Sequence, residues 1–147
     1  MMLTEQEIRT QQGAGTIEIE AFDPARLNAG GYPLRLAPEL LLYWEVVLTT
    51  QGQNRKRRMM IPQEGVVLRP GRVYLARTLE HTRTQGYLSQ VTGLPALEQL
   101  GLSVRGTAEP DGVWTLAISC VQPVRLYPGM EIGQIRYQLP LGASLPR

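Results

Sequence analysis

Cysteine and histidine most often carry metal or nucleophilic chemistry in proteins, and this sequence has one of each, Cys120 and His81. One chain therefore cannot build a Cys/His zinc site, a disulfide framework or a Cys–His dyad with a spare ligand. Metal chemistry would have to use carboxylates. We interpret Cys120 as a small buried hydrophobe in a strand. His81 lies in a polar stretch and is expected at the surface.

Charge gives little indication of a polyanionic partner, because the formal net charge is only +2. The one local excess is Arg55, Lys56, Arg57 and Arg58, between two apolar stretches. Such a run at a loop tip is typical of a solvated surface, and no aromatic residue interleaves it, so we expect no nucleic-acid partner.

Composition limits the class of protein. Apolar residues make up 43% of the 147 residues, and no apolar run approaches the length of a bilayer span, so we expect no membrane partner. The first residues are polar and lack the pattern of a secretory signal, so we expect a cytoplasmic protein. The length suits one domain with a real hydrophobic core.

The opening of the chain predicts a short helix. Thr4 can cap it, Glu7 three residues later can return the bond, and Leu3 can pack onto Ile8. Residues 16–20 then alternate apolar and charged side chains, which is typical of a strand with one solvated face.

From Tyr32 onward, short β-prone runs recur between turn residues, which favours a barrel or sandwich. Residues 69–72 and 127–130 each carry a Pro-Gly pair typical of a type II turn. Residues 113–121 form the longest β-prone run, and one parity of that run is apolar and predicted to face the core: Trp114, Leu116, Ile118 and Cys120. A short helix is expected at residues 95–102, where Pro begins and Gly ends the pattern.

Several segments, in order along the chain, resemble bacterial and archaeal dCTP deaminases and the related bifunctional deaminase-dUTPases of the dCTP deaminase/dUTPase superfamily. Residues 32–36 resemble the motif Y-D-L-R-L, and residues 125–134 are close to L-x-P-G-M-x-I-G-Q. The other matching segments are residues 2–9, 19–28, 68–80 and 97–102. Each match is weak alone, but their common order covers most of the chain.

The resemblance implies a mainly β fold, a distorted β-barrel of the dUTPase type with a short N-terminal helix and one short internal helix. It also implies a homotrimer with nucleotide sites between subunits. We expect one barrel domain at residues 1–139 and a loose tail at residues 140–147. Fold alone does not carry function.

The family's phosphate-binding signature, G-R-S-S-L-A-R, has changed here. Leu94 and Gln99 stand at the arginine places, and Pro95 and Ala96 stand at the serine places. Each charge-assisted hydrogen bond is worth about 1.5–3 kcal/mol, so the loss of this set should weaken triphosphate binding by orders of magnitude.

The family's general base, a glutamate in a T-L-E strand motif, corresponds here to Ala117, which cannot move a proton. The loop before it, which in the family recognises the pyrimidine and carries an aspartate for dUTPase activity, is shortened to residues 107–112. Glu109 or Asp111 could replace that aspartate, although both also suit a turn.

These changes favour a catalytically inactive trimeric homologue with a binding, regulatory or structural role and no cofactor. A vestigial pyrimidine nucleoside or nucleotide site would lie near Thr107, Ala108, Trp114 and Thr115, although Trp114 also fits a core or interface position. The alternatives are a dUTPase-like nucleotide pyrophosphatase, using Glu109 or Asp111 with Mg²⁺, and an active dCTP deaminase with relocated residues. Only the pyrophosphatase alternative requires a metal.

Overall fold

The computed structural model describes residues 1–140 and 142. Its secondary-structure elements are, in chain order, α1 (Glu5–Ala14), β1 (Ile17–Ile19), the 3-10 turn η1 (Pro24–Arg26), β2 (Tyr32–Tyr43), β3 (Lys56–Met60), β4 (Val66–Leu68), β5 (Tyr74–Thr78), β6 (Thr82–Thr84), β7 (Leu88–Gly93), α2 (Pro95–Glu98), β8 (Leu102–Ala108), β9 (Trp114–Cys120), β10 (Val124–Leu126) and β11 (Glu131–Gln138). The tail expected at residues 140–147 lies largely outside the described residues.

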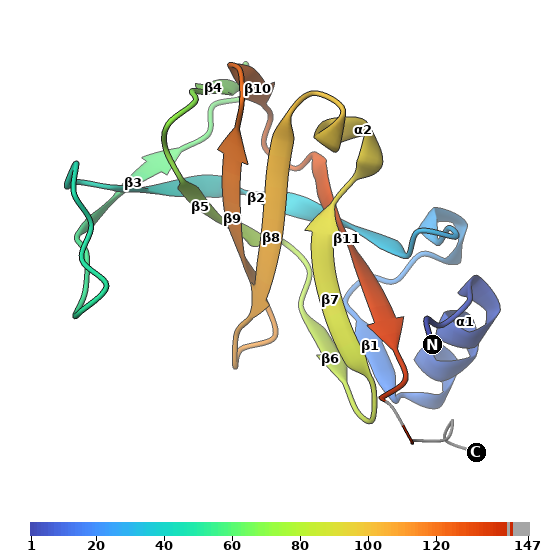
Figure 1. Ribbon diagram of the computed structural model, residues 1–147. Coiled ribbons are helices and arrows are strands. Elements are labelled where there is room, and N and C mark those ends of the chain that lie inside the picture. Colours follow the sequence, from blue (N-terminus) through green and yellow to red (C-terminus); the bar gives the residue numbers. More distant parts are fainter. Residues whose placement is uncertain (141, 143–147) are drawn as a thin grey trace.

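The strands close into an antiparallel barrel (Figure 1). The order β11-β7-β8-β9-β5-β2 returns to its start because β11 also pairs with β2, and β3 adds to the outer half of β2. Two short pairs, β4 with β10 and β1 with β6, lie at opposite ends of the barrel. This is the mainly β barrel with two short helices that the sequence predicts.

The ends of α1 confirm the predicted capping. The Thr4 hydroxyl accepts a hydrogen bond from the Glu7 amide, and the Glu7 carboxylate accepts one from the Thr4 amide. Gly15 ends the helix with a φ of 83°, a left-handed conformation that glycine adopts without a Cβ penalty. The helix packs against β1 near the chain's N-terminus (Figure 1).

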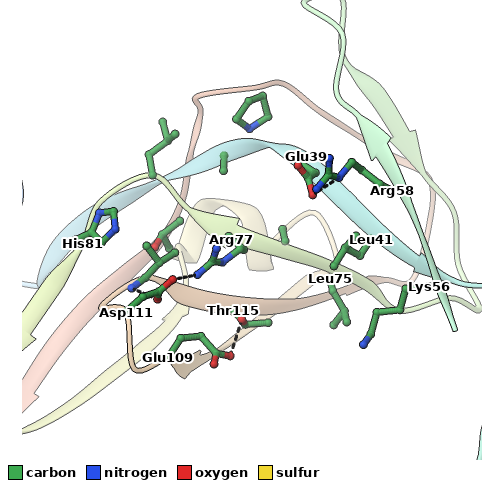
Figure 2. A pocket seen from close by; sticks show the side chains of 16 residues that line it. Glu39, Leu41, Lys56, Arg58, Leu75, Arg77, His81, Glu109, Asp111 and Thr115 are labelled. Carbon is green, nitrogen blue, oxygen red and sulfur yellow. Dashed lines mark hydrogen bonds and ion pairs between the residues drawn. The ribbon is translucent and has the colours of Figure 1, made fainter. Parts of the chain in front are cut away.

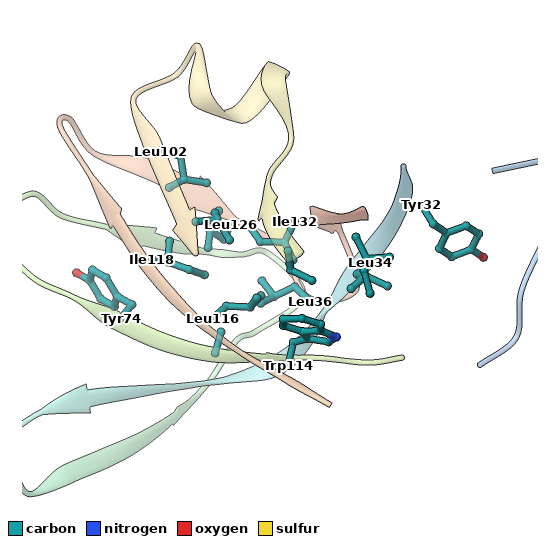
Figure 3. Packing of buried hydrophobic residues seen from close by; sticks show 14 of the residues in the cluster. Tyr32, Leu34, Leu36, Tyr74, Leu102, Trp114, Leu116, Ile118, Leu126 and Ile132 are labelled. Atoms are coloured by element: carbon teal, nitrogen blue, oxygen red, sulfur yellow. The ribbon is translucent and has the colours of Figure 1, made fainter. Parts of the chain in front are cut away.

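The core fills the inside of the barrel (Figure 3). Strand β9 contributes its predicted parity, because Trp114, Leu116, Ile118 and Cys120 are all buried. The alternate residues of the same strand therefore face outward: Thr115 and Ser119 are half-buried and Ala117 is exposed. This alternation positions the candidate site on the outer face of the sheet.

The basic run was predicted at a loop tip, and this was wrong because most of it lies in a strand. Lys56, Arg57 and Arg58 lie in β3, where Lys56 pairs in register with Tyr43 and its ammonium lies 5.8 Å from that ring's centroid. The guanidinium of Arg57 lies 5.8 Å from the centroid of the Trp44 ring. No aromatic residue interleaves the run in sequence, but Tyr43 and Trp44, in and just after the partner strand β2, lie beside it in space.

Candidate functional site

A groove of about 600 Å³ runs over the outer face of the sheet (Figure 2). Strands β2, β3, β5 and β9 and the β8–β9 hairpin supply its walls. Its lining is Ala37, Pro38, Glu39, Leu41, Lys56, Arg58, Leu75, Ala76, Arg77, Thr78, Leu79, His81, Glu109, Asp111, Val113 and Thr115. Both carboxylates singled out in the sequence, Glu109 and Asp111, are in this set.

Ion pairs and hydrogen bonds already engage most charged groups of the groove. The Arg77 guanidinium donates to Asp111 Oδ2 at 2.5 Å, and the other Asp111 oxygen accepts the Val113 amide at 3.1 Å. The hydrogen bond from Arg77 is the main reason that the pKa of Asp111 lies below its usual value. The Thr115 hydroxyl donates to Glu109 Oε1 at 2.7 Å. These contacts hold both carboxylates against the groove wall.

The shortened β8–β9 loop is a closed turn. The Glu109 amide donates to the Val113 carbonyl at 3.1 Å, and the Gly112 amide donates to the Glu109 carbonyl at 3.0 Å. Gly112 has a φ of 90°, and a Cβ there would lie 3.0 Å from the Thr82 carbonyl oxygen, so glycine is required. The strand pairing therefore continues to the turn without a gap.

The structure brings the predicted nucleotide-binding residues together, since Thr107 pairs with Thr115 and Ala108 with Trp114. They do not share one surface. Thr115 lines the groove, whereas Trp114 is only 4% exposed and faces the core. Its amide donates to Thr78 Oγ1 and its indole Nε1 donates to Thr82 Oγ1 at 2.8 Å. Trp114 is thus a satisfied core residue.

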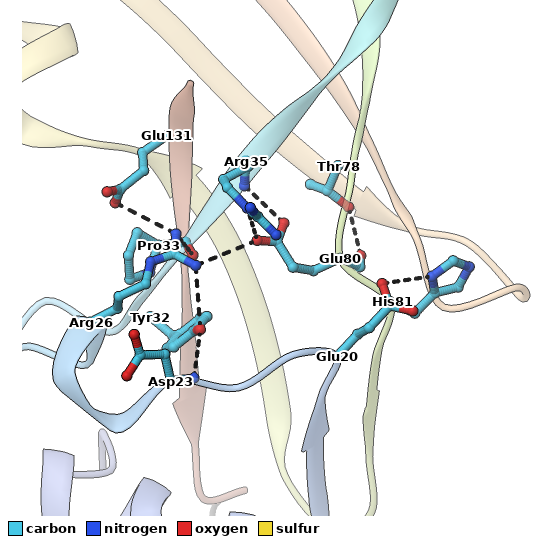
Figure 4. Close-up of polar contacts among 10 residues, drawn as sticks. All are labelled: Glu20, Asp23, Arg26, Tyr32, Pro33, Arg35, Thr78, Glu80, His81 and Glu131. Carbon is cyan, nitrogen blue, oxygen red and sulfur yellow. Dashed lines mark hydrogen bonds and ion pairs between the residues drawn. The ribbon is translucent and has the colours of Figure 1, made fainter. Parts of the chain in front are cut away.

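The buried carboxylate of Glu80, which is 1% exposed, was not among the predicted site residues (Figure 4). It accepts the Arg35 amide at 2.8 Å and Arg35 Nε at 2.9 Å, and Arg26 NH1 lies 3.8 Å away. The hydrogen bond with Glu80 raises the pKa of Arg35. Spacing alone could not reveal this pair, because the two residues are far apart in sequence and meet only where β2 lies beside the end of β5.

Comparison with known proteins decides the family. A family model described as dCTP deaminase-like matches residues 2–139.

The chain belongs to the dCTP deaminase-like family.

A dCTP deaminase of Rhodopirellula baltica is 46% identical over 142 residues, which span 93% of this chain and 71% of the relative. A protein of Hathewaya histolytica named "dCTP deaminase, dUMP-forming" is 42% identical, with 93% of this chain and 82% of the relative covered. The crystal structure of 2'-deoxycytidine 5'-triphosphate deaminase from Agrobacterium tumefaciens matches 95% of this chain with a TM-score of 0.71 at 19% identity. This chain spans 48% of that solved chain, so the likeness shows the fold.

In this dCTP deaminase-like protein, the segment at the place of the phosphate-binding signature lies on α2, away from the groove. Leu94, Pro95, Ala96 and Gln99 do not line it. Another hollow, of about 570 Å³, is lined by residues of β7 and β8 and by Glu98 of α2, and Thr92 pairs in register with Arg105 there. Arg105 and Glu98 both line this hollow.

Within the described part of the chain, no three His, Cys, Asp or Glu side chains cluster so as to hold a metal ion. The groove carries three carboxylates, Glu39, Glu109 and Asp111, and Glu39 pairs with Arg58 at 3.0 Å. Glu109 and Asp111 also have internal partners, Thr115 and Arg77 respectively. Nor does any helix in the described residues have the length and apolar character needed to cross a membrane.

Proposed function

We propose that this dCTP deaminase-like protein does not deaminate dCTP and acts instead as a trimeric binding or regulatory protein. The observation that carries the proposal is the surroundings of Ala117. Its methyl group is exposed on β9, and its register partners are Leu75 on β5 and Arg105 on β8. Neither partner can serve as a general base, because leucine has no titratable group and arginine stays protonated.

The two candidate carboxylates do not replace the missing glutamate. Glu109 and Asp111 lie in the β8–β9 turn and not at position 117 of β9. Each accepts a hydrogen bond from a neighbouring side chain, Thr115 for Glu109 and Arg77 for Asp111. The depressed pKa of Asp111 makes it a weaker base at neutral pH than a free carboxylate. Deamination would therefore lack the acid-base assistance that typically contributes about 10²–10⁴-fold in rate.

One experiment separates this proposal from its rivals. Purified protein is incubated with dCTP or dUTP in the presence of Mg²⁺, and ammonia and pyrophosphate are both measured, with the Rhodopirellula baltica relative as positive control. We expect no ammonia above the buffer control. Ammonia release that a single carboxylate substitution abolishes would overturn the proposal.

The pyrophosphatase alternative is favoured only by the presence of both Glu109 and Asp111 in the groove. It requires pyrophosphate release that depends on Mg²⁺ and is lost in Glu109→Gln or Asp111→Asn. Release unchanged in both variants would point to a contaminant. The same assay therefore tests both functions.

If a nucleoside still binds near Thr107 and Thr115, we expect it to bind about as tightly as its triphosphate. The reason is that α2 offers no arginine or serine at the places of the family signature. Calorimetric titration with deoxycytidine and with dCTP measures this ratio. A strong preference for dCTP would contradict the loss of the phosphate site.

A further inference from the structure

The outer ends of β2 and β3, with the chain that joins them, form a ribbon, residues 42–57, that leads away from the barrel (Figure 1). Tyr43 pairs in register with Lys56, and the Trp44 amide donates to the Arg55 carbonyl at 2.9 Å. Tryptophan is on average a highly buried residue, yet Trp44 is 61% exposed. The ribbon therefore holds an indole ring in solvent at a defined place.

The surroundings of Trp44 have an excess of positive charge. Arg55 and Arg57 come from the ribbon and Arg72 from the turn between β4 and β5, and all three are exposed. The one acid among them is Glu45, which pairs with Arg55 at 2.8 Å. Neither Arg57 nor Arg72 makes an ion pair within residues 1–140 and 142. Two guanidinium groups are therefore available to an anion.

The groove over the outer face of the sheet has no such excess. Apart from His81, its cationic side chains and its carboxylates are equal in number: Lys56, Arg58 and Arg77 against Glu39, Glu109 and Asp111. A polyanion would therefore be attracted to the surroundings of Trp44 more than to the groove.

A hollow of about 260 Å³ adjoins both aromatic residues of the ribbon and shares no lining residue with the groove. Its lining is Leu42, Tyr43, Trp44, Glu45, Val46, Leu48, Gly71, Arg72 and Val73. Sites that bury a drug-sized ligand typically measure about 300–1,000 Å³, so this hollow suits a smaller group. Its aromatic and aliphatic side chains can contact the faces of a planar base, and the guanidinium of Arg72 can bind a phosphate.

The expectation of no nucleic-acid partner rested on the absence of aromatic residues within the basic run. In the folded chain, Lys56 Nζ lies 5.8 Å from the centroid of the Tyr43 ring, and Arg57 Cζ lies 5.8 Å from that of the Trp44 ring. Cations beside exposed aromatic rings bind single strands, because phosphates pair with the cations and unpaired bases stack on the rings. We propose that the ribbon binds single-stranded nucleic acid, with Trp44 stacked on a base and Arg57 and Arg72 on the backbone. This binding does not depend on the loss of deamination.

An anionic lipid surface is the main rival, because Val46 and Val47 of the ribbon are 100% and 83% exposed. The turn beyond them, at residues 49–54, has only polar side chains and glycine. A bilayer would have to admit this polar turn before the valines. A single strand meets no such obstacle, since it lies along the surface of the ribbon.

The first test is fluorescence anisotropy with a labelled strand of about 16 nucleotides, as DNA, as RNA and as DNA duplex, in about 50 mM salt. We expect single strands to bind with a Kd of about 10⁻⁶–10⁻⁴ M and the duplex to bind more weakly, because its bases are already stacked. Trp44→Ala should weaken binding about 5–150-fold, and Trp44→Phe should retain most of the affinity. The matched control is Tyr127→Ala, which removes an aromatic ring that is 46% exposed outside the ribbon, and it should leave the Kd unchanged.

The salt dependence tests the backbone contacts. Arg57→Gln should reduce the slope of log K against log salt by about 0.7, the value for one phosphate contact to a single strand. The control is Arg9→Gln, because Arg9 is an exposed residue of α1, which lies on the other side of the barrel from the ribbon (Figure 1). Equal changes of slope in both variants would overturn the proposal, since net charge alone would then explain the binding.

Intrinsic fluorescence locates the base. The chain has two tryptophans, and Trp114 is only 4% exposed, so quenching during the titration reports stacking on Trp44. We expect single strands to quench the unaltered protein but not Trp44→Phe, which still binds. Far-UV circular dichroism shows whether each variant is folded.

Three results would overturn the proposal: no binding of single strands in about 50 mM salt, a Kd unaffected by Trp44→Ala, or equal affinity for the duplex. Sedimentation with phosphatidylserine vesicles but no binding of oligonucleotides would assign the ribbon to lipid instead. A preference for DNA or for RNA supports the proposal and identifies the strand. None of these results changes the outcome of the ammonia assay, so the two proposals fail separately.

Discussion

The buried ion pair of Glu80 offers a sharp test of what holds the barrel beside the groove. Glu80→Gln keeps the shape of the side chain but removes its charge, and places an amide NH₂ against either the Arg35 amide or its guanidinium. Both of these groups now donate to the carboxylate, at 2.8 and 2.9 Å. The substitution therefore sets a donor against a donor inside the protein.

Removing one partner of a buried pair typically costs about 3–5 kcal/mol. Here water relieves part of the cost, because the Arg35 side chain is 41% exposed, and glutamine keeps one acceptor. We therefore expect Glu80→Gln to lower the free energy of unfolding by about 2–4 kcal/mol.

The matched control is Glu39→Gln. Glu39 pairs with Arg58 at 3.0 Å, a similar distance, but its side chain is 37% exposed, so its loss should cost less than about 1 kcal/mol. Urea unfolding followed by tryptophan fluorescence, at one fixed protein concentration, measures both variants. Equal effects of the two substitutions would refute the argument that burial decides the cost.

Three further predictions concern single substitutions. Arg77→Met should raise the pKa of Asp111 toward its ordinary value of about 3.9, because the donor that depresses it is gone; carboxyl NMR titration measures this. Since Asp111 has the lower pKa when folded, the pair stabilises the protein above the ordinary pKa, and this contribution is lost as the pH falls through the depressed value. Gly106→Ala should lower the free energy of unfolding by about 1–3 kcal/mol, since its Cβ would lie 2.7 Å from Val91 Cβ; thermal melting tests it. Ala117→Glu alone should release no measurable ammonia from dCTP, and turnover there would show a pocket more intact than proposed.

Local signals in the sequence predicted the elements well. The Thr4 and Glu7 capping box, the core-facing parity of β9 and the exposed position of His81 are all confirmed. Each depends on neighbours in sequence, on hydrogen bonds three residues apart or on the twofold alternation of a strand. Gly71 and Gly129 likewise have the positive φ that their predicted turns need.

The features that the sequence did not predict depend on contacts between residues far apart in the chain. The basic run was misplaced because nothing near Lys56 in sequence shows that Tyr43 lies opposite it. Arg77 entered the candidate site only through its contact with Asp111, 34 residues away. The one available signal was strand parity, which turns Arg77 outward between the buried Ala76 and Thr78.

The closed turn and the alanine at position 117 act on the same face of the sheet, which is why one substitution is not expected to restore deamination. The backbone hydrogen bonds between β8 and β9 continue up to Glu109 and Val113. Because strand pairing uses the backbone groups of this hairpin, recognition of a pyrimidine there would have to use side chains. A glutamate at position 117 would supply a proton acceptor but would not reopen the turn. The effects on rate of residues that act as a unit in catalysis are not additive. A new acid-base residue therefore has little effect until the hairpin again holds the pyrimidine beside it.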